Sequence, residues 1–290
     1  MKPFYYFFIA LFAVSCNGEL DSEPCDAISA PAPCEAILKR LECMNMPRPK
    51  DSYNYPLCPG MDEWADLHTS VAMGEACSVP ECLLKKMSTQ AVIQAIWERP
   101  VGDINERFGL GGLPDYWSAK NWAPFSTCLE LENRKDAGKA LLERLILVNP
   151  IPQYAGGHES QALEWLFAQS VFISQLNKTQ QRKVVEICLK NDELRQKSPL
   201  WEEYSMFRWL RTTAFVLMGR TMLAADYSPF VKAVNENEEL KFFIDGWIDG
   251  GDPLGVYDNG GKAPYSYRSI RWIDSGIPAI IINHAKNYIK

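Results

Sequence analysis

Pro199–Leu223 reads PLWEEYSMFRWLRTTAFVLMGRTML, with apolar residues on nearly every side of a helical wheel. A helix that is hydrophobic all round is buried all round, so this stretch predicts a helix at the centre of the core. Its arginines, Arg208, Arg211 and Arg220, are then expected to reach the surface or to meet carboxylates, because an unpaired buried charge is very costly.

Helical spacing continues on both sides of this central stretch. Ile96 and Trp97, for example, follow Ile93 by three and four residues, which places all three side chains on one face of a helix. The expected helices span residues 34–43, 62–68, 70–77, 80–87, 90–98, 135–148, 158–176, 180–196 and, in one or two pieces, 228–247.

Ser88 or Thr89, Asn133 and Thr179 precede three of these helices and are expected to cap them. Alternating strand patterns are nearly absent, and residues 279–282 are the one short candidate. The sequence therefore predicts an all-α fold with a Cys-rich N-terminal part. The fold is either an irregular multi-helix bundle or an α-solenoid-like stack, since short helices follow one another but no clear repeat is present.

Composition is that of a folded globular protein, with 47% hydrophobic and 23% charged residues in a chain of 290. The formal net charge is -6, and no basic stripe stands out along the sequence. These features argue against nucleic acid as a partner.

The N-terminus has the pattern of an export signal. Met1 and Lys2 precede the uncharged run 3–14, which is too short to cross a bilayer as a helix but fits a secretory signal peptide. Ala13-Val14-Ser15-Cys16 resembles a lipobox, in which the cysteine becomes the first residue and is acylated. The position three before the cysteine is usually Leu and is here Ala13, so an ordinary secretory cleavage site is the alternative.

Besides Cys16 the chain has eight cysteines, and six of them fall between residues 25 and 82. An even number in an exported chain suggests disulfides, because that compartment is oxidising. No C-x-x-C pair is present, which disfavours zinc. Cys128 and Cys188 lie on apolar helical faces and also fit buried free thiols.

These observations predict the organisation of the chain. We expect a lipoprotein signal peptide at 1–15, an acidic, Pro-containing tether at 16–33 and a helical domain at 34–290. Within that domain, 34–100 is the Cys-rich part and 123–290 is the main helical core. The expected location is the cell envelope, where a lipid such as palmitate on Cys16 would anchor the chain to the outer membrane, facing either the periplasm or the exterior.

Three segments are similar to a group of uncharacterised cell-envelope proteins of Bacteroidota. They are LLKKMSTQA at 83–91, NRKDAGK at 133–139, and RTT at 211–213 with its continuation RTM at 220–222. The resemblance extends over about Tyr53–Trp247. It implies an envelope location and a helical fold, and it implies no catalytic residue.

Two groups of residues are candidates for binding. Aromatic side chains in the Gly- and Pro-rich segment 108–125 can stack on sugars or peptides, although they can equally pack the loop onto the helices. They are Tyr116, Trp117, Trp122 and Phe125. Oxygen-rich loops suit Ca²⁺, and three aspartates provide such a loop without the EF-hand spacing. They are Asp249, Asp252 and Asp258.

Catalytic motifs are missing from the sequence. It contains no H-E-x-x-H, G-x-S-x-G or P-loop pattern, and nothing in it predicts a cofactor. The histidines, His68, His158 and His284, are far apart in sequence. We therefore expect a non-catalytic module that binds a glycan or an envelope protein. The alternative is a hydrolase with dispersed catalytic residues, since the members of a triad need not be neighbours in sequence.

Overall fold

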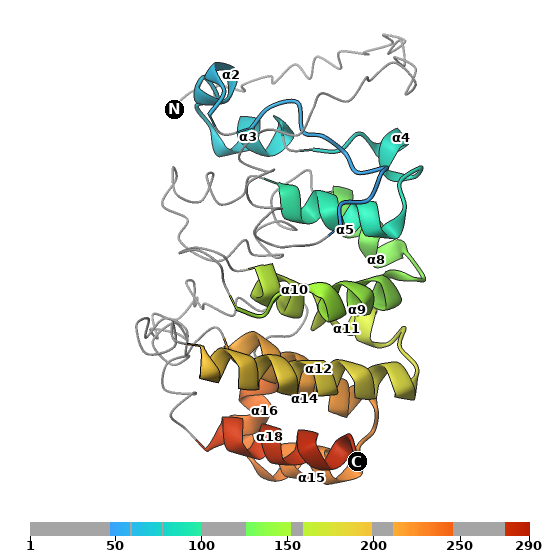
Figure 1. Cartoon of the computed structure of the whole chain (residues 1–290), viewed down its shortest axis with the longest axis vertical. Coiled ribbons are helices and arrows are strands. Elements are labelled where there is room, and N and C mark those ends of the chain that lie inside the picture. Colours follow the sequence, from blue (N-terminus) through green and yellow to red (C-terminus); the bar gives the residue numbers. More distant parts are fainter. Residues whose placement is uncertain are drawn as a thin grey trace, which may run out of the picture.

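The computed structural model describes residues 47–58, 60–76, 78–99, 126–151, 159–198, 211–245 and 276–290. Within these ranges the secondary structure is helical and contains no strand, which confirms the all-α prediction. The helices stack in successive layers along the long axis of the molecule, with the N-terminal helices at one end and the C-terminal helices at the other (Figure 1). The arrangement is thus a layered multi-helix stack.

The N-terminal layers consist of short helices. They are α2 (Asp62–Ala65), α3 (Ser70–Ala76), α4 (Glu81–Leu84), α5 (Thr89–Glu98) and α8 (Ser126–Asn133). Ser88 caps α5, because its side chain accepts a hydrogen bond from the backbone N–H of Ala91. This confirms Ser88, one of the two caps expected there.

The remaining layers contain the three longest helices of the described residues together with shorter ones. They are α9 (Ala137–Leu147), α10 (Glu159–Phe167), α11 (Ser170–Ile173), α12 (Lys178–Lys197), α14 (Thr212–Ala224), α15 (Ser228–Glu236), α16 (Glu238–Asp245) and α18 (Ile277–Tyr288). Helix α14 packs against α10, α11, α12, α15, α16 and α18. Every residue from Thr212 to Met222 is buried, so the described part of the stretch 199–223 forms the centre of the core as predicted.

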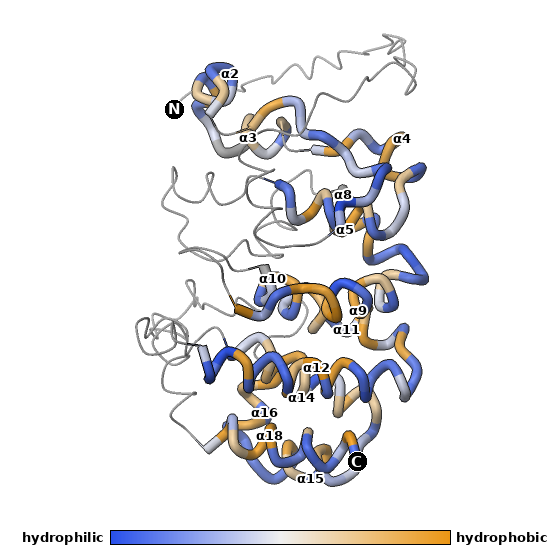
Figure 2. The backbone as a smooth tube through the Cα atoms, in the orientation of Figure 1, coloured by the Kyte–Doolittle hydropathy of each residue, from blue (hydrophilic) through white to orange (hydrophobic). Residues whose placement is uncertain are grey.

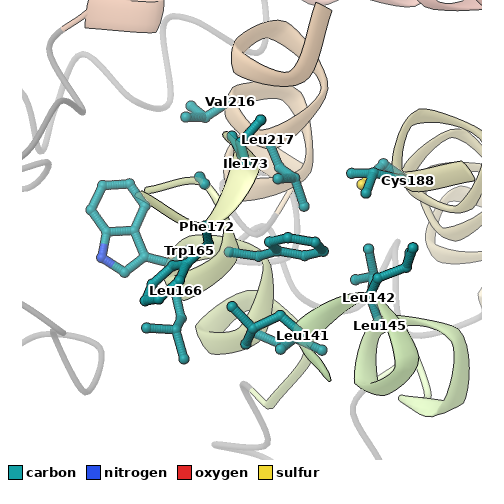
Figure 3. Packing of buried hydrophobic residues seen from close by; sticks show 14 of the residues in the cluster. Leu141, Leu142, Leu145, Trp165, Leu166, Phe172, Ile173, Cys188, Val216 and Leu217 are labelled. Carbon is teal, nitrogen blue, oxygen red and sulfur yellow. The ribbon is translucent and has the colours of Figure 1, made fainter. Parts of the chain in front are cut away.

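Apolar side chains from several layers meet beside α14. Figure 3 shows Phe172 of α11 lying close to Leu141 of α9, with Val216 and Leu217 of α14 on the other side. Cys188 of α12 faces the same cluster (Figure 3). All of these side chains are buried, and burial of apolar surface is the main force that stabilises such a stack.

The solvent-facing helices are two-sided in hydropathy. Figure 2 shows hydrophilic and hydrophobic residues alternating along α12 and α15, whose apolar positions lie towards the core. Among the residues that the structure describes, no helix combines the length and the apolar composition needed to cross a bilayer.

Some of the expected helix boundaries are wrong. The single helix expected over 158–176 is interrupted at Ala168 and Gln169, and the chain forms α10 and α11 in its place. The strand candidate at 279–282 lies inside α18. Its isoleucines resemble a buried strand, but a short apolar run by itself does not distinguish a strand from a buried helix.

Two of the expected caps are also wrong. Asn133 is the last residue of α8, and α9 begins only after Asp136. Helix α12 is capped by Asn177, whose side chain accepts a hydrogen bond from the backbone N–H of Gln180 while Gln180 accepts one from Asn177, a capping box. Thr179, the expected cap, lies two residues too late, inside the helix.

The cysteines of the described residues fall into two classes. Cys58 and Cys82 are each in a disulfide, as expected for the Cys-rich part. Cys128 and Cys188 are buried thiols outside any disulfide, which confirms that interpretation for both. The expected helix at 34–43 lies outside the described residues.

Candidate functional site

Charged side chains meet inside the layer formed by α10, α12 and α14, and they are the first place to look for chemistry in this fold. Glu164 of α10 has no exposed surface. Arg195 of α12 holds it through two hydrogen bonds, Nη1 to Oε2 at 3.1 Å and Nη2 to Oε1 at 2.7 Å. Thr213 of α14 donates a third from Oγ1 to Oε2 at 2.7 Å. One carboxylate therefore joins three helices.

Arg195 also contacts the connection before α10. Its Nε donates to the carbonyl of Pro150 at 3.0 Å, and its Nη2 donates to Oγ of Ser160 at 2.9 Å. The side chains of Arg195 and Glu164 are 2% and 0% exposed. This planar, bidentate pairing is the geometry that suits guanidinium and carboxylate groups.

A second buried pair lies one turn away on α12. Arg211, just before α14, donates to both carboxylate oxygens of Asp192, with Nη2 at 2.8 Å from Oδ2. Gln196 donates to the same Oδ2 at 2.8 Å. The guanidinium of Arg211 also lies 4.9 Å from the ring centre of Phe215.

Two arginines of the central stretch are described, and both have polar partners. Arg211 meets a carboxylate, as expected from the sequence. Arg220 is 6% exposed and donates to Oγ of Ser170 at 2.8 Å. Arg208 lies outside the described residues.

Burial changes the acidity of two groups in this layer. Loss of solvent raises the pKa of Glu164, although Arg195 and Thr213 act in the opposite direction. Burial also raises the pKa of the Cys188 thiol well above its usual value, and the nearby charge of Glu164 adds to the effect. A thiol with a raised pKa is a poor nucleophile, because the thiolate is the reactive form.

Three polar side chains beside these pairs have buried atoms without a hydrogen-bond partner in the described structure. They are the amide of Gln161 on α10, the amide nitrogen of Asn191 on α12 and the hydroxyl of Thr212 on α14. Gln161 has no exposed surface. Such groups lower stability unless water or another polar atom meets them.

A comparable network connects α5 with α9. Arg144 of α9 donates from Nε to Oε1 of Gln90 at 2.6 Å and from Nη1 to Oε1 of Gln94 at 2.7 Å. Gln94 in turn donates to Glu98, which receives two hydrogen bonds from Arg48. Burial lowers the pKa of Arg144 to about 10, and the charge of Glu98 opposes that shift.

Two of the sequence segments singled out above also meet in space. Arg134 donates to the carbonyls of Leu84 and Met87, both at 2.6 Å. Thr89 donates to Oδ1 of Asp136 at 2.7 Å. Segments 83–91 and 133–139 are therefore joined by polar contacts. These contacts hold the turn between α8 and α9 against the segment between α4 and α5.

These networks hold helices together, and their geometry fits that role better than catalysis. The buried charged groups of the α10–α12–α14 layer are oriented towards other protein groups, and Glu164 has no surface through which a substrate could reach it. Perturbed pKa values also arise in structural ion pairs. The sequence contained a signal for this layer, since Glu164, Asp192 and Arg195 are charged residues at core-facing helical positions.

The binding and lipidation residues expected from the sequence lie outside the described residues. They are Cys16, Tyr116, Trp117, Trp122, Phe125, Asp249, Asp252 and Asp258. Within the described ranges, no group of three or more His, Cys, Asp or Glu side chains is placed to hold a metal ion.

The histidines are not brought together by the described fold. His68 is exposed near the N-terminal end, and His158 lies outside the described residues. His284 of α18 lies against aromatic rings, 5.4 Å from Phe230 and 6.3 Å from Tyr227 between ring centres. Partial burial lowers the pKa of His284.

Comparison with known proteins adds no assignment: no family model matches the chain, and no curated protein or solved structure is significantly similar to it.

Proposed function

We propose that this chain is a lipid-anchored protein of the bacterial cell envelope that binds a glycan or a protein partner without transforming it. The signal-like segment 1–15 and Cys16 are the basis for the anchor and the location. The observation that supports a binding role is the use of the buried charges. Glu164, Arg195 and Asp192 form ion pairs that link neighbouring helices. These links make the stack a rigid support for surface segments.

Layered helical stacks present extended surfaces, and macromolecular partners use such surfaces. The proposed contact is the aromatic segment with Trp117 and Trp122, because planar side chains on a rigid scaffold stack well on sugar faces and peptide side chains. A weaker proposal is a Ca²⁺ ion held by Asp249, Asp252 and Asp258.

Thermal unfolding of the chain from residue 16 onward, with Cys16→Ser, tests this proposal. The melts are recorded with peptidoglycan fragments, neutral and acidic glycans and Ca²⁺. A ligand at about 100 times its dissociation constant stabilises the folded state by roughly 2.7 kcal/mol, which gives a clear upward shift in Tm. The class of compound that raises Tm then identifies the partner chemistry.

Matched variants locate the contact. Trp117→Ala with Trp122→Ala should abolish the shift, whereas Phe242→Ala should retain it, since Phe242 is an exposed aromatic residue on α16, outside the segment. A folded Trp117/Trp122 variant that keeps full binding would exclude the aromatic segment. Turnover of any compound that is lost in a folded His158→Ala or His284→Ala variant would favour the hydrolase alternative over a binding protein.

The anchor has a separate test. Cells that express the full chain and are fed radiolabelled palmitate should label the protein and place it in the membrane fraction. Cys16→Ala should lose both the label and the membrane association, and Cys188→Ala, a buried thiol of α12, should keep both. Label retained in the Cys16→Ala variant would contradict the lipid anchor.

A further inference from the structure

The solvent-facing side of α12 and the C-terminal segment 277–290 is basic, although the chain as a whole is acidic. The exposed basic side chains there are Lys178, Arg182, Lys183, Lys190, Lys197, Lys286 and Lys290. The exposed acidic side chains are Glu186 and Glu193. We call these seven basic residues the basic face. Helices α12 and α18 contact each other and run side by side in the foreground of Figure 1.

Helical geometry arranges part of the basic face in a line. Lys183, Lys190 and Lys197 are spaced by seven residues, so they follow one side of α12 with a drift of about 20° per step. With a rise of about 1.5 Å per residue, they extend over roughly 21 Å. Val184 and Cys188 lie on the opposite, buried side of the helix and keep this row turned to solvent.

Few acidic side chains neutralise these charges. Lys183 pairs with Glu186 at 3.0 Å, and both side chains are about half exposed, so the pair contributes little stability. For the other six basic residues, the described part of the chain shows no ion pair with a carboxylate. Arg182 lies 6.0 Å from the ring centre of Tyr288, a contact that leaves its charge uncompensated.

Helices α2 and α3, at the other end of the stack (Figure 1), are acidic. Residues 60–76, which include α2 and α3, contain Asp62, Glu63, Asp66 and Glu75 and no Lys or Arg. These four carboxylates are exposed. Among the described residues, the basic excess is confined to α12 and the segment 277–290, since α15 and α16 beside them also expose Glu236, Glu238 and Glu239. The basic face and the acidic N-terminal helices would therefore respond differently to a charged surface.

We propose that the basic face binds the anionic phospholipid headgroups of the membrane to which the chain is tethered. The charges are spread along two neighbouring helices and do not converge on one point, which suits an extended anionic surface better than a small ligand. Each Lys or Arg close to an anionic leaflet adds attraction that falls off within a Debye length. The choice of a bilayer, and not a free phosphate compound, as the ligand rests on the proposed function, because the lipid anchor would keep the basic face close to the membrane.

Vesicle sedimentation tests this binding without any acyl chain. The protein is the chain from residue 16 with Cys16→Ser, and the vesicles are pure phosphatidylcholine or contain about 30% phosphatidylglycerol, at low and at high NaCl. We expect at least about tenfold stronger association with the phosphatidylglycerol vesicles at about 50 mM salt, and its loss at about 500 mM, because salt screens exposed charges.

Two triple variants with the same change in net charge separate the basic face from overall charge. Lys183→Glu, Lys190→Glu and Lys197→Glu should abolish the preference for anionic vesicles. Lys50→Glu, Lys135→Glu and Lys241→Glu, three exposed lysines away from the face, should keep it within about twofold. If the first variant does not fold, Lys→Gln at the same three positions should weaken the preference by an intermediate amount.

The proposal is overturned if both triple variants lose binding equally, or if the unmodified face shows no preference for anionic vesicles. Binding of soluble polyphosphate without binding of vesicles would also overturn it, because the occupant would then be a free anionic polymer. None of these results bears on palmitate labelling or on ligand-induced melting shifts, so failure here is distinguishable from failure of the proposed function.

Discussion

At the scale of single residues, the stability of this protein depends on how buried charges find partners. Glu164 and Arg195 are almost completely removed from solvent, and each carries the opposite charge that compensates the other. Replacing such a pair with apolar residues can be neutral, but removing one partner leaves an isolated buried charge, which is far more costly. A single substitution that removes one partner should therefore lower the free energy of unfolding more than a double substitution that removes both.

Arg195→Met should lower the free energy of unfolding by about 3–5 kcal/mol at neutral pH, because Glu164 would stay buried without its cation. Urea denaturation followed by circular dichroism measures this loss. Glu164→Gln combined with Arg195→Met should recover part of it. Lys183→Met is the matched control, since it breaks an exposed ion pair and should cost at most about 1 kcal/mol. A similar small cost for Arg195→Met would mean that Glu164 is not charged in the folded state.

The two free thiols give a second prediction at this scale. Cys128 and Cys188 have no exposed surface, and burial raises the pKa of Cys188. Both should resist alkylation by iodoacetamide at pH 8 in the folded protein and react once urea unfolds it. Mass spectrometry counts the labels, and Cys128→Ala and Cys188→Ala should each remove one of them. Rapid labelling of either cysteine under native conditions would contradict its buried position.

At the scale of secondary-structure elements, the ends of helices are decided by local hydrogen bonds. Helix α12 begins with a reciprocal pair between Asn177 and Gln180 at 2.9 and 3.0 Å. Both groups satisfy backbone N–H donors that the first turn leaves unpaired. Thr179 is exposed, and its position two residues after the cap places it within the helix.

Asn177→Ala should therefore destabilise the protein by about 1 kcal/mol, within the range of 0.5–2 kcal/mol typical of N-caps. Thr179→Ala should have little effect, because alanine is the better helix former at an exposed position. Comparison of the two variants by thermal unfolding distinguishes the caps. A larger loss in Thr179→Ala than in Asn177→Ala would place the start of the helix at Thr179.

At the scale of the whole molecule, the spacing between layers is set by small residues as well as by large ones. Gly138 of α9 approaches α11 so closely that an added Cβ would lie 2.4 Å from the carbonyl oxygen of Phe172. This oxygen belongs to the backbone of α11, so no side-chain rotation can relieve the clash. Gln175 strengthens the same approach, since its Oε1 accepts a hydrogen bond from the N–H of Gly138 at 2.8 Å.

Gly138→Ala should lower stability by about 1–3 kcal/mol, the usual cost of forcing an extra methyl group into a packed interior. Gly74→Ala is the control, because an added Cβ in α3 would meet nothing within 4 Å. That substitution should be neutral or stabilise the protein by up to about 1 kcal/mol, since it reduces the entropy of the unfolded chain. Equal effects of the two substitutions in chemical denaturation would argue against close contact between α9 and α11.

By itself, the sequence determined the fold class and the buried central helix, while it left Cys128 and Cys188 open between disulfides and buried thiols. The fold class and the central helix follow from a local pattern, because an apolar residue every three or four positions has one stable arrangement in water. The sequence also limited the cap of α5 to Ser88 or Thr89, and the structure selected Ser88. The start of α12 is also present in the local pattern, as the capping-box pair Asn177 and Gln180, and not at the expected Thr179. The break at Ala168 and Gln169 is not apparent from the apolar spacing.

Only the tertiary structure decided which charges meet. Glu164 is 31 residues from Arg195 and 49 from Thr213 along the chain, and no spacing rule relates them. The same holds for the basic face, since α12 and α18 are far apart in sequence and become neighbours only in the folded stack. Pairing of charges depends on distance in space, and the packing of layers sets that distance after the helices have formed.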